Sequence, residues 1–145
     1  MSKKTYVCLN CEQTVTKINT LGKYCSAKCQ NEYQNNLIIE EWKNDHTKGM
    51  RSGFRLKTPI RKYILEKYDN KCSQCGWNKI NTTTNKSPLE IDHIDGDCCN
   101  NKEENLRVLC PNCHSLTPNY RALNKGNGNR KRLQYFNLIG SEALK

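Results

Sequence analysis

Apolar side chains recur at helical spacing in two stretches of the chain. The first stretch spans residues 27–45, and its apolar positions are Tyr33, Leu37, Ile38 and Trp42. The second spans residues 58–70, and its apolar positions are Ile60, Tyr63, Ile64 and Tyr68. Because the members of each band lie about one helical turn apart, both stretches are predicted to be helices with one apolar face. A hydroxyl at Ser26 and the Thr58-Pro59 pair are typical of helix starts.

Two shorter segments have the character of strands. Residues 89–93 alternate apolar and polar side chains, and a turn at Gly96 is expected to end that strand. A second strand is predicted over residues 106–109, immediately after Asn105. A short hairpin is predicted in the N-terminal part of the chain, around residues 14–23. Together with the helices, these elements predict a small α+β protein.

Cysteine is far more abundant than a core of this size requires. The chain has 145 residues, 35% of them hydrophobic, and ten of them are cysteines. Its first residues show no apolar signal segment, and no apolar run is long enough to cross a membrane, so we expect a cytoplasmic protein. In a reducing compartment, paired cysteines are more often metal ligands than disulfides. A structural zinc ion can supply on the order of 10 kcal/mol of folding free energy, which would compensate for a small core.

The cysteines form two sets, each made of two close pairs. The first set is Cys8, Cys11, Cys25 and Cys29, with thirteen residues between its pairs. The second set is Cys72, Cys75, Cys110 and Cys113, with thirty-four residues between its pairs. Four thiolates in two pairs match a tetrahedral zinc site closed by protein ligands, so the sequence predicts two structural Zn²⁺ ions. The remaining cysteines, Cys98 and Cys99, are interpreted as loop residues and not as ligands.

Two other uses of the second set are less favoured. The segment Cys110-x-x-Cys113-His114 matches the attachment pattern of c-type haem. No export signal is expected here, and the partner pair Cys72 and Cys75 already accounts for both thiols. A thioredoxin-like function is disfavoured because no parallel βαβ pattern surrounds the two cysteines.

Positive charge lies on both sides of an acidic segment. The chain has a net charge of +10, to which residues 1–50 contribute +2 and residues 51–145 contribute +8. Within the second half, residues 89–117 carry six acidic and two basic side chains. This layout suits a polyanion held at its flanks around a centrally bound cation.

The acidic segment also contains the candidate chemistry. Asp92 and His114 offer an oxygen and a nitrogen to one divalent cation, with positions left open for phosphate and water. His93 suits a general base, because an unperturbed imidazole has a pKa of about 6.5. In a regular strand, Asp92 and His93 point to opposite faces. Both can serve one phosphate only if the backbone kinks there, or if the metal and the water approach from different sides.

Asp92-His93, Asn105 and Cys113-His114, bracketed by the cysteine pairs, resemble the HNH (ββα-metal) endonuclease family, especially its phage and homing-type members. The resemblance covers residues 58–127 and includes the segment Leu-Cys-Pro-Asn-Cys-His-Ser-Leu-Thr-Pro-Asn-Tyr. It implies a ββα-metal fold with Asp92, His93, Asn105 and His114 as the catalytic set. Asn105 would hold the loop and orient His93 through its amide. The N-terminal module resembles the treble-clef-like zinc fingers found at the front of phage nucleases.

The resemblance also implies an activity and a location. The protein would hydrolyse DNA phosphodiesters, leaving 5′-phosphates, with one divalent ion such as Mg²⁺, in a bacterium or a phage-infected cell. The expected order is a Cys₄ finger with its helix at 1–46, a basic linker at 47–57, the nuclease domain at 58–125 and a basic tail at 126–145. Ten basic side chains are candidate nucleic-acid contacts: Arg55, Lys57, Arg61, Lys62, Arg107, Arg121, Lys125, Arg130, Lys131 and Arg132.

Several alternatives stay open at this level. A non-catalytic DNA-binding zinc module explains the basic arms equally well, and a zinc-dependent adaptor for another protein is disfavoured by the charge layout. The cation could be Mg²⁺, Mn²⁺, Ni²⁺ or Zn²⁺, because an Asp and a His suit all four. Double-stranded DNA is the expected substrate, with RNA as an alternative. Target sequence, nicking or double-strand cleavage, and oligomeric state are not determined.

Overall fold

A computed structural model describes residues 3–18, 22–51, 55–125 and 134 of the chain. The chain divides into two compact units, Met1–Glu40 and Glu41–Lys145, which are described separately below. The predicted basic contacts Arg130, Lys131 and Arg132 lie outside the described residues.

The smaller unit contains a hairpin and the start of a helix. Strands β1 (Lys3–Val7) and β2 (Thr14–Ile18) pair antiparallel, so the hairpin turns around the Cys8–Cys11 pair and not within residues 14–23 as expected; of the predicted hairpin, the described residues contain only the strand that begins at Thr14. Helix α1 (Ala27–Asn44) begins where Ser26 was expected to cap it, and the Ser26 hydroxyl accepts a hydrogen bond from the Cys29 amide at 3.2 Å. Its predicted extent, residues 27–45, is therefore confirmed to within one residue.

Short elements occupy the stretch that was expected to be a basic linker. They are a 3₁₀ turn η1 (His46–Gly49) and two-residue strands β3 (Met50–Arg51) and β4 (Arg55–Leu56), which pair antiparallel. The Lys57 amide donates to the Gly49 carbonyl at 2.9 Å and closes this small ribbon. The ribbon belongs to the larger unit and leads directly into helix α2.

Helix α2 (Thr58–Lys67) begins at the predicted Thr58-Pro59 pair but is shorter than expected. Asp69 and Asn70 have φ values of 52° and 53°, so the left-handed backbone ends the helix before residue 70. The side chain of Thr58 makes no cap hydrogen bond, because Lys57 occupies the capping position. Ile60 and Ile64 are completely buried, as their spacing predicted.

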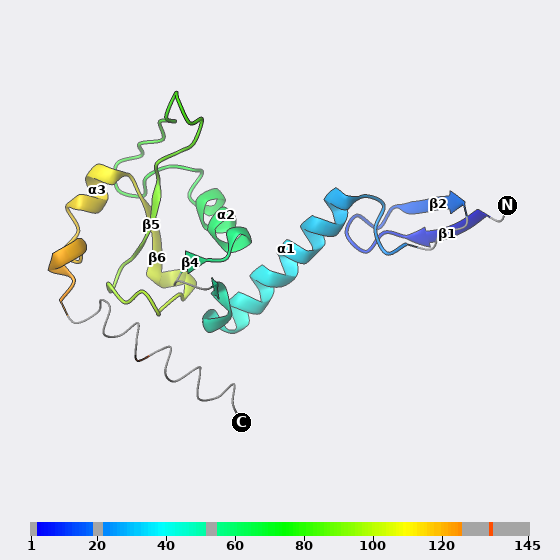
Figure 1. Cartoon of the computed structure of the whole chain (residues 1–145), viewed down its shortest axis with the longest axis horizontal. Coiled ribbons are helices and arrows are strands. Elements are labelled where there is room, and N and C mark those ends of the chain that lie inside the picture. Colours follow the sequence, from blue (N-terminus) through cyan, green and yellow to red (C-terminus); the bar gives the residue numbers. More distant parts are fainter. Residues whose placement is uncertain (1–2, 19–21, 52–54, 126–133, 135–145) are drawn as a thin grey trace. The chain divides into compact units, whose positions relative to one another are not determined.

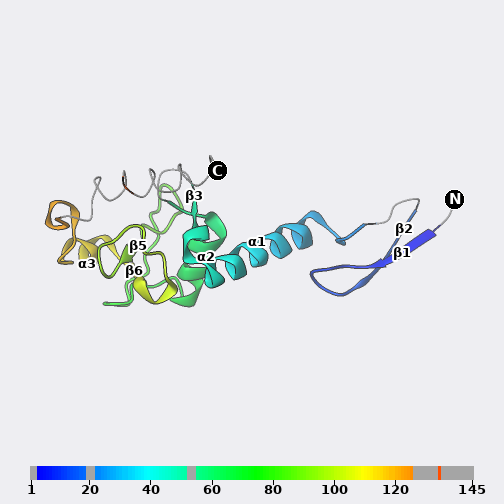
Figure 2. The ribbon, with the colours of Figure 1, turned by 90° about the horizontal axis from the view of Figure 1, so that it is seen from below.

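A two-stranded ribbon and a short helix follow α2 in the larger unit (Figure 1). The elements are β5 (Glu90–His93), η2 (Glu103–Asn105), β6 (Leu106–Leu109), α3 (Pro111–Ser115) and η3 (Arg121–Leu123). Strands β5 and β6 are antiparallel, and α2 and α3 both contact them. The second view shows the same neighbours, with α3 next to the ribbon (Figure 2). The predicted small α+β class is thus confirmed.

The core of the larger unit is small. Its fully buried apolar side chains come from α2, β6 and the residue before β5: Ile60, Ile64, Leu89, Leu106, Val108 and Leu109. Trp42, near the end of α1, is 1% exposed and belongs to the same unit. No helix among the described residues is both long and apolar enough to span a membrane.

Candidate metal and acid–base site

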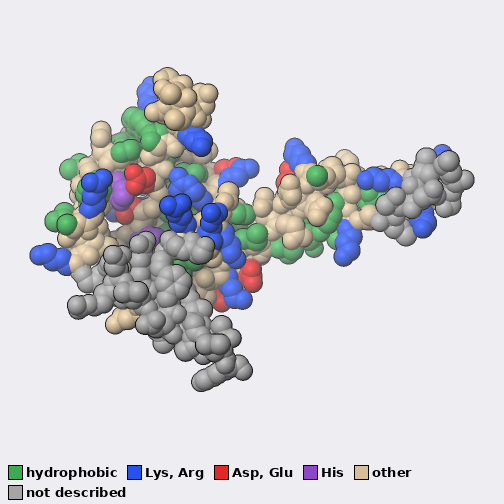
Figure 3. Space-filling model, viewed as in Figure 1, with side chains coloured by type: hydrophobic (Ala, Val, Ile, Leu, Met, Phe, Trp, Pro, Cys, Tyr) green, Lys and Arg blue, Asp and Glu red, His purple; other side chains and the backbone are tan. Residues whose placement is uncertain are grey.

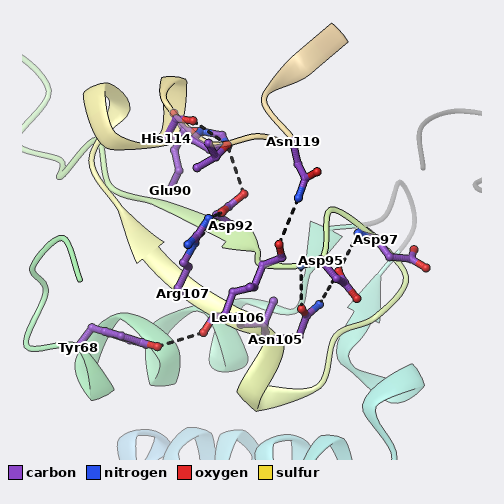
Figure 4. A network of polar contacts seen from close by, with 12 residues as sticks. Tyr68, Glu90, Asp92, Asp95, Asp97, Asn105, Leu106, Arg107, His114 and Asn119 are labelled. Atoms are coloured by element: carbon purple, nitrogen blue, oxygen red, sulfur yellow. Dashed lines mark hydrogen bonds and ion pairs between the residues drawn. The ribbon is translucent and has the colours of Figure 1, made fainter. Parts of the chain in front are cut away.

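The strand register places the predicted metal-binding carboxylate opposite an arginine. Asp92 of β5 pairs with Arg107 of β6, and both side chains lie on the same face of the ribbon (Figure 4). The Arg107 Nε and Nη2 atoms lie 2.9 and 2.8 Å from Asp92 Oδ2. Arg107 was expected to contact nucleic acid, but in the structure it holds Asp92. Because this contact uses one carboxylate oxygen, the other, Oδ1, faces His114.

His114 on α3 completes a short chain of polar groups. Its Nε2 atom lies 3.5 Å from Asp92 Oδ1, and its Nδ1 atom lies 2.8 Å from Glu90 Oε2. Tyr120 packs edge-on against the imidazole, with 5.2 Å between ring centroids. A carboxylate on one ring nitrogen fixes the tautomer and leaves the other nitrogen free as a ligand. Glu90 was not anticipated, although its position two residues before Asp92 places it on the same strand face.

The spacing of Asp92 and His114 suits a shared cation. Two ligands bound at right angles to one ion at about 2.1 Å are about 3.0 Å apart. The observed separation of 3.5 Å between Asp92 Oδ1 and His114 Nε2 is slightly larger, so a small side-chain movement would bring both atoms onto one ion. One carboxylate oxygen and one imidazole nitrogen match the donor set that several divalent metals accept.

His93 lies on the other face of β5, as strand alternation predicts. Its side chain and that of Ile91 line a cavity of about 430 Å³. The same cavity is lined by Arg51, Arg55 and Arg61. Asp92 and His93 therefore face different surroundings. Asp92 faces Arg107 and His114, and His93 faces a cluster of guanidinium groups. The sequence left open whether the backbone kinks at this point; the structure has both residues within one regular strand.

The hydrogen-bond partner of the His93 ring is Asn101, and not Asn105 as expected. His93 Nε2 lies 3.0 Å from Asn101 Oδ1, and Asn101 is 1% exposed. The Asn101 amide nitrogen lies 3.3 Å from the Cys99 carbonyl oxygen and 3.5 Å from that of Cys98, which directs the amide oxygen toward the ring. The Asn101 carbonyl in turn accepts a 2.7 Å hydrogen bond from the indole nitrogen of Trp42. Asn101 lies in a loop, where no periodic pattern marks a residue as functional.

Asn105 instead organises the loop that follows β5. Its side-chain nitrogen donates to Asp95 Oδ1 at 2.9 Å and to the Asn100 carbonyl at 2.8 Å, and its side-chain oxygen accepts from the Asp95 amide. Burial opposes ionisation of Asp95, but the hydrogen bonds from Asn100 and Asn105 outweigh it and lower the pKa of that carboxyl. The predicted loop-holding role of Asn105 thus has a structural counterpart.

Two side chains from the segment after α3 hold the turn at Gly96 by hydrogen bonds. Gly96 has a φ of +75°, and a Cβ built there would come within 2.8 Å of Asn119 and Asn124 side-chain atoms. Those two side chains donate to the Ile94 and Gly96 carbonyls at 3.2 and 2.8 Å. The positive φ favours glycine, and a Cβ there would also have to displace the two amide side chains.

Each predicted cysteine set comes together in the structure. The sulfur atoms within each set of four lie within 4.8 Å of one another. Zinc–sulfur bonds of about 2.3 Å in a tetrahedron place the sulfurs about 3.8 Å apart. In the first set, Cys11 and Cys25 are 3.7 Å apart and Cys25 and Cys29 are 3.2 Å apart; in the second, Cys75 and Cys110 are 3.8 Å apart. Both sets therefore fit a tetrahedral ion of the size of Zn²⁺.

The thiols of the two sets show the same electrostatic pattern. Burial opposes ionisation of Cys8 and Cys72, but backbone hydrogen bonds outweigh it and lower the pKa of each thiol to about 6. Hydrogen bonds to the neighbouring thiols Cys29 and Cys75 raise the pKa of Cys25 and Cys113, respectively, to about 12. Because crowded thiols resist losing every proton, a bound cation is needed to stabilise four thiolates together.

A third group of possible ligands lies in the loop after β5. Single ligand atoms of Asp97, Cys98 and Cys99 also come within 4.8 Å of one another. Asp97 accepts a hydrogen bond from the Cys99 amide at 3.0 Å, which is an ordinary local turn. Both cysteines thus lie in the loop, as interpreted from the sequence, but their sulfur atoms also come close enough to Asp97 to share one ion, which that interpretation did not anticipate.

The remaining predicted nucleic-acid contacts are distributed over the larger unit. Arg55 and Arg61 line the cavity beside His93. Lys62 is exposed and lies 3.6 Å from Glu66, and Lys125 is exposed. Arg121 lies over the Tyr120 ring, which places a guanidinium next to the ring that packs on His114. The face in Figure 3 shows Lys and Arg side chains grouped beside histidine and acidic side chains.

These elements define a small α+β unit in which Asp92 and His114 form a candidate cation site, with His93 on the opposite face of the same strand. The chain is similar to an "H-N-H endonuclease F-TflIV" of Escherichia phage T5, which is 41% identical over 76 residues, covering 52% of this chain and 31% of that protein. This similarity confirms the resemblance expected from the sequence.

A second relative covers more of the chain at lower identity. The "Zorya protein ZorE" of Escherichia coli is 28% identical over 124 residues, which is 77% of this chain and 32% of that protein. The chain thus spans about a third of the length of the curated relatives it matches. Neither a family model nor a solved structure matches it.

Proposed function

We propose that this chain is a divalent-metal-dependent HNH endonuclease that hydrolyses DNA phosphodiester bonds. The observation that carries the proposal is that two neighbouring side chains of β5 point to opposite faces of the strand. Asp92 points to His114 on one side, and His93 points away from that pair into a basic cavity on the other. The similarity to a phage H-N-H endonuclease supports the same class. Strands β5 and β6 with helix α3 would then form the ββα-metal unit.

A cation held by Asp92 and His114 would neutralise charge on the phosphate and on the departing oxygen. The chain's own residues prepare that position. Arg107 holds one oxygen of Asp92, and Glu90 holds the far nitrogen of His114, so both ligand atoms are oriented in advance. Mg²⁺ is our first choice, because a carboxylate with open positions for water and phosphate suits it.

His93 would take the proton from the attacking water. The Asn101 amide oxygen faces His93 Nε2, so that nitrogen must carry the hydrogen of the neutral ring. The proton-accepting atom is then Nδ1. In an in-line displacement, the attacking and leaving oxygens lie on opposite sides of the phosphorus. A base and a cation site on opposite faces of one strand suit that requirement, so the opposite directions of Asp92 and His93 are compatible with both proposed roles.

The rest of the chain would serve folding and binding. The two Cys₄ sets would each hold a structural Zn²⁺, and the basic side chains would contact the phosphate backbone of double-stranded DNA. A phage or homing-type origin is consistent with the relative from Escherichia phage T5. Cleavage leaving 5′-phosphates follows if the departing oxygen is the 3′ oxygen on the cation side.

The decisive test compares His93→Ala with His46→Ala on supercoiled plasmid, with and without added Mg²⁺ and with zinc content measured throughout. His46 is the matched control, because it lies outside the site and in the same unit. Loss of a general base typically lowers the rate by about 10²- to 10⁴-fold. We expect that loss for His93→Ala alone, with zinc content and DNA affinity unchanged.

Cleavage by His93→Ala at the wild-type rate would contradict the general-base role. If the wild-type chain binds DNA but cuts neither DNA nor RNA with Mg²⁺, Mn²⁺, Ni²⁺ or Zn²⁺, the protein is a binding module and the nuclease proposal is wrong.

A further inference from the structure

Two arginines face each other on the shortest ribbon of the larger unit. In the β3–β4 pair, Arg51 lies directly opposite Arg55. Like charges at directly opposed positions destabilise a ladder, and this ladder has two residue pairs in all. Among the described residues, neither guanidinium forms an ion pair with a carboxylate. Such an arrangement costs stability unless an anion joins it.

A third guanidinium completes the cluster from α2. Arg61 donates through Nη2 to the Leu89 carbonyl at 2.9 Å, which anchors it beside β5. With Arg51 and Arg55 it lines the cavity of about 430 Å³ that also contains the His93 side chain. Thr58 adds a hydroxyl, and no acidic side chain belongs to the described lining. Cavities of this order of size accept small ligands or a fragment of a larger one.

We propose that this cavity binds a second backbone phosphate of the nucleic acid, adjacent to the bond that His93 would act on. The proposal rests on the proposed function for the identity of the substrate. Guanidinium groups bind phosphate through paired, charge-assisted hydrogen bonds, and three of them around one opening leave an excess of positive charge. Binding of a phosphate there removes the repulsion between Arg51 and Arg55.

Because of its position, the cavity would orient the nucleic-acid strand as well as increase the affinity for it. His93 forms part of its wall, so a phosphate bound to Arg51 and Arg55 fixes the strand relative to the base. Small errors in the placement of a reacting group reduce rates strongly. The cavity therefore acts as a positioning site for the strand, on the face of β5 away from the candidate cation site.

The test measures binding separately from cleavage. Arg51→Gln, Arg55→Gln and the double variant are compared with Lys79→Gln, which removes the same charge from an exposed loop residue. Affinity for a labelled DNA duplex is measured by fluorescence anisotropy at several salt concentrations, without added divalent cation. Each cavity variant should weaken binding by about tenfold and reduce the slope of log affinity against log salt by about one. Lys79→Gln should change neither quantity appreciably.

A second measurement uses the wild-type chain and so avoids any folding defect of the variants. Duplexes that carry one uncharged methylphosphonate linkage at successive positions should show one position where affinity falls by the same factor as in Arg51→Gln. Combining that linkage with Arg51→Gln should produce no further loss, because both changes remove the same contact.

Equal salt slopes for the cavity variants and Lys79→Gln, or full additivity with every linkage, would overturn the cavity proposal. If the binding effects appear but no protein cuts DNA under any metal condition, the nuclease proposal fails while the phosphate site stands. If wild-type and cavity variants cut equally well and bind equally well, the cavity proposal fails while the nuclease proposal stands.

Discussion

The two Cys₄ sets have the same chemistry and different neighbours. Each set has a pair of sulfur atoms at tetrahedral spacing, 3.7 Å in the first and 3.8 Å in the second, and each has one thiol with its pKa lowered to about 6 and one with its pKa raised to about 12. The two sets differ in the length and content of the chain between their cysteine pairs. Thirteen residues separate the first pairs, whereas thirty-four separate the second and include both β5 and β6.

The second set is built into the candidate site. Cys110 follows β6 directly and caps α3, where it accepts a hydrogen bond from the Cys113 amide. His114 directly follows Cys113. At the other pair of the set, the amide of Ser73, next to Cys72, donates to the Val108 carbonyl of β6 at 2.8 Å. A metal ion bound there would hold the end of a strand and the start of the helix that presents His114. We therefore expect identical cysteine sets to differ in functional importance according to what the intervening chain presents.

The largest expected effect separates the two sets directly. Cys113→Ser should remove zinc from the second set and abolish cleavage, because structural zinc supplies on the order of 10 kcal/mol and the small core of the larger unit cannot replace it. Cys29→Ser is the matched control in the first set, and it should leave the catalytic rate constant of the larger unit close to wild type. Zinc content by mass spectrometry and single-turnover cleavage rates measure both outcomes.

Equal losses of cleavage in Cys29→Ser and Cys113→Ser would show that the first set also supports the site. Loss of one zinc ion from each variant, and not of two, is the required control for this comparison.

A smaller effect is expected at the support of His114. Glu90→Gln keeps the shape of the side chain but removes the charge that holds His114 Nδ1. Loss of such a partner typically weakens metal binding by about 10- to 100-fold. The concentration of Mg²⁺ needed for half-maximal cleavage should rise by that factor, with the rate recovering at saturating Mg²⁺. Glu104→Gln, an exposed carboxylate in the same unit, is the control.

An unchanged Mg²⁺ dependence in Glu90→Gln would mean that Cys113 and the zinc site alone position His114. The second Cys₄ set would then be more important to the site than the contacts of β5.

The smallest expected effect concerns the other face of β5. Asn101→Ala removes the acceptor at His93 Nε2, so the neutral ring should no longer be held in one tautomer. We expect the rate constant to fall by about tenfold with KM nearly unchanged, as for a group that positions a general base. Imidazole ¹⁵N spectra of the chain should show mixed tautomers for His93 in this variant, and Asn112→Ala should leave them unaltered.

A single, unchanged His93 tautomer in Asn101→Ala would contradict the assignment of Nδ1 as the proton acceptor. This readout does not depend on cleavage, so it tests the hydrogen bond even if the substrate is different.

Local patterns determined much of the protein from sequence alone. The helical bands ending near Trp42 and around Ile64, the strand over 106–109 and the close cysteine pairs depend on spacings within a few residues, and the structure has all of them. The opposite directions of Asp92 and His93 likewise follow from the two-residue period of a strand. These features could be predicted because covalent geometry imposes them wherever the element forms.

Tertiary structure decided which groups meet. The contacts of Asn101 with His93 and of Glu90 with His114 join residues from different elements, and so does the cavity that collects Arg51, Arg55 and Arg61. Each depends on the pairing register of a ribbon or on how a loop returns to the core, and no local periodicity encodes that. The sequence therefore determined the candidate ligands and their elements, while packing of β5 against its neighbours decided which residues orient them.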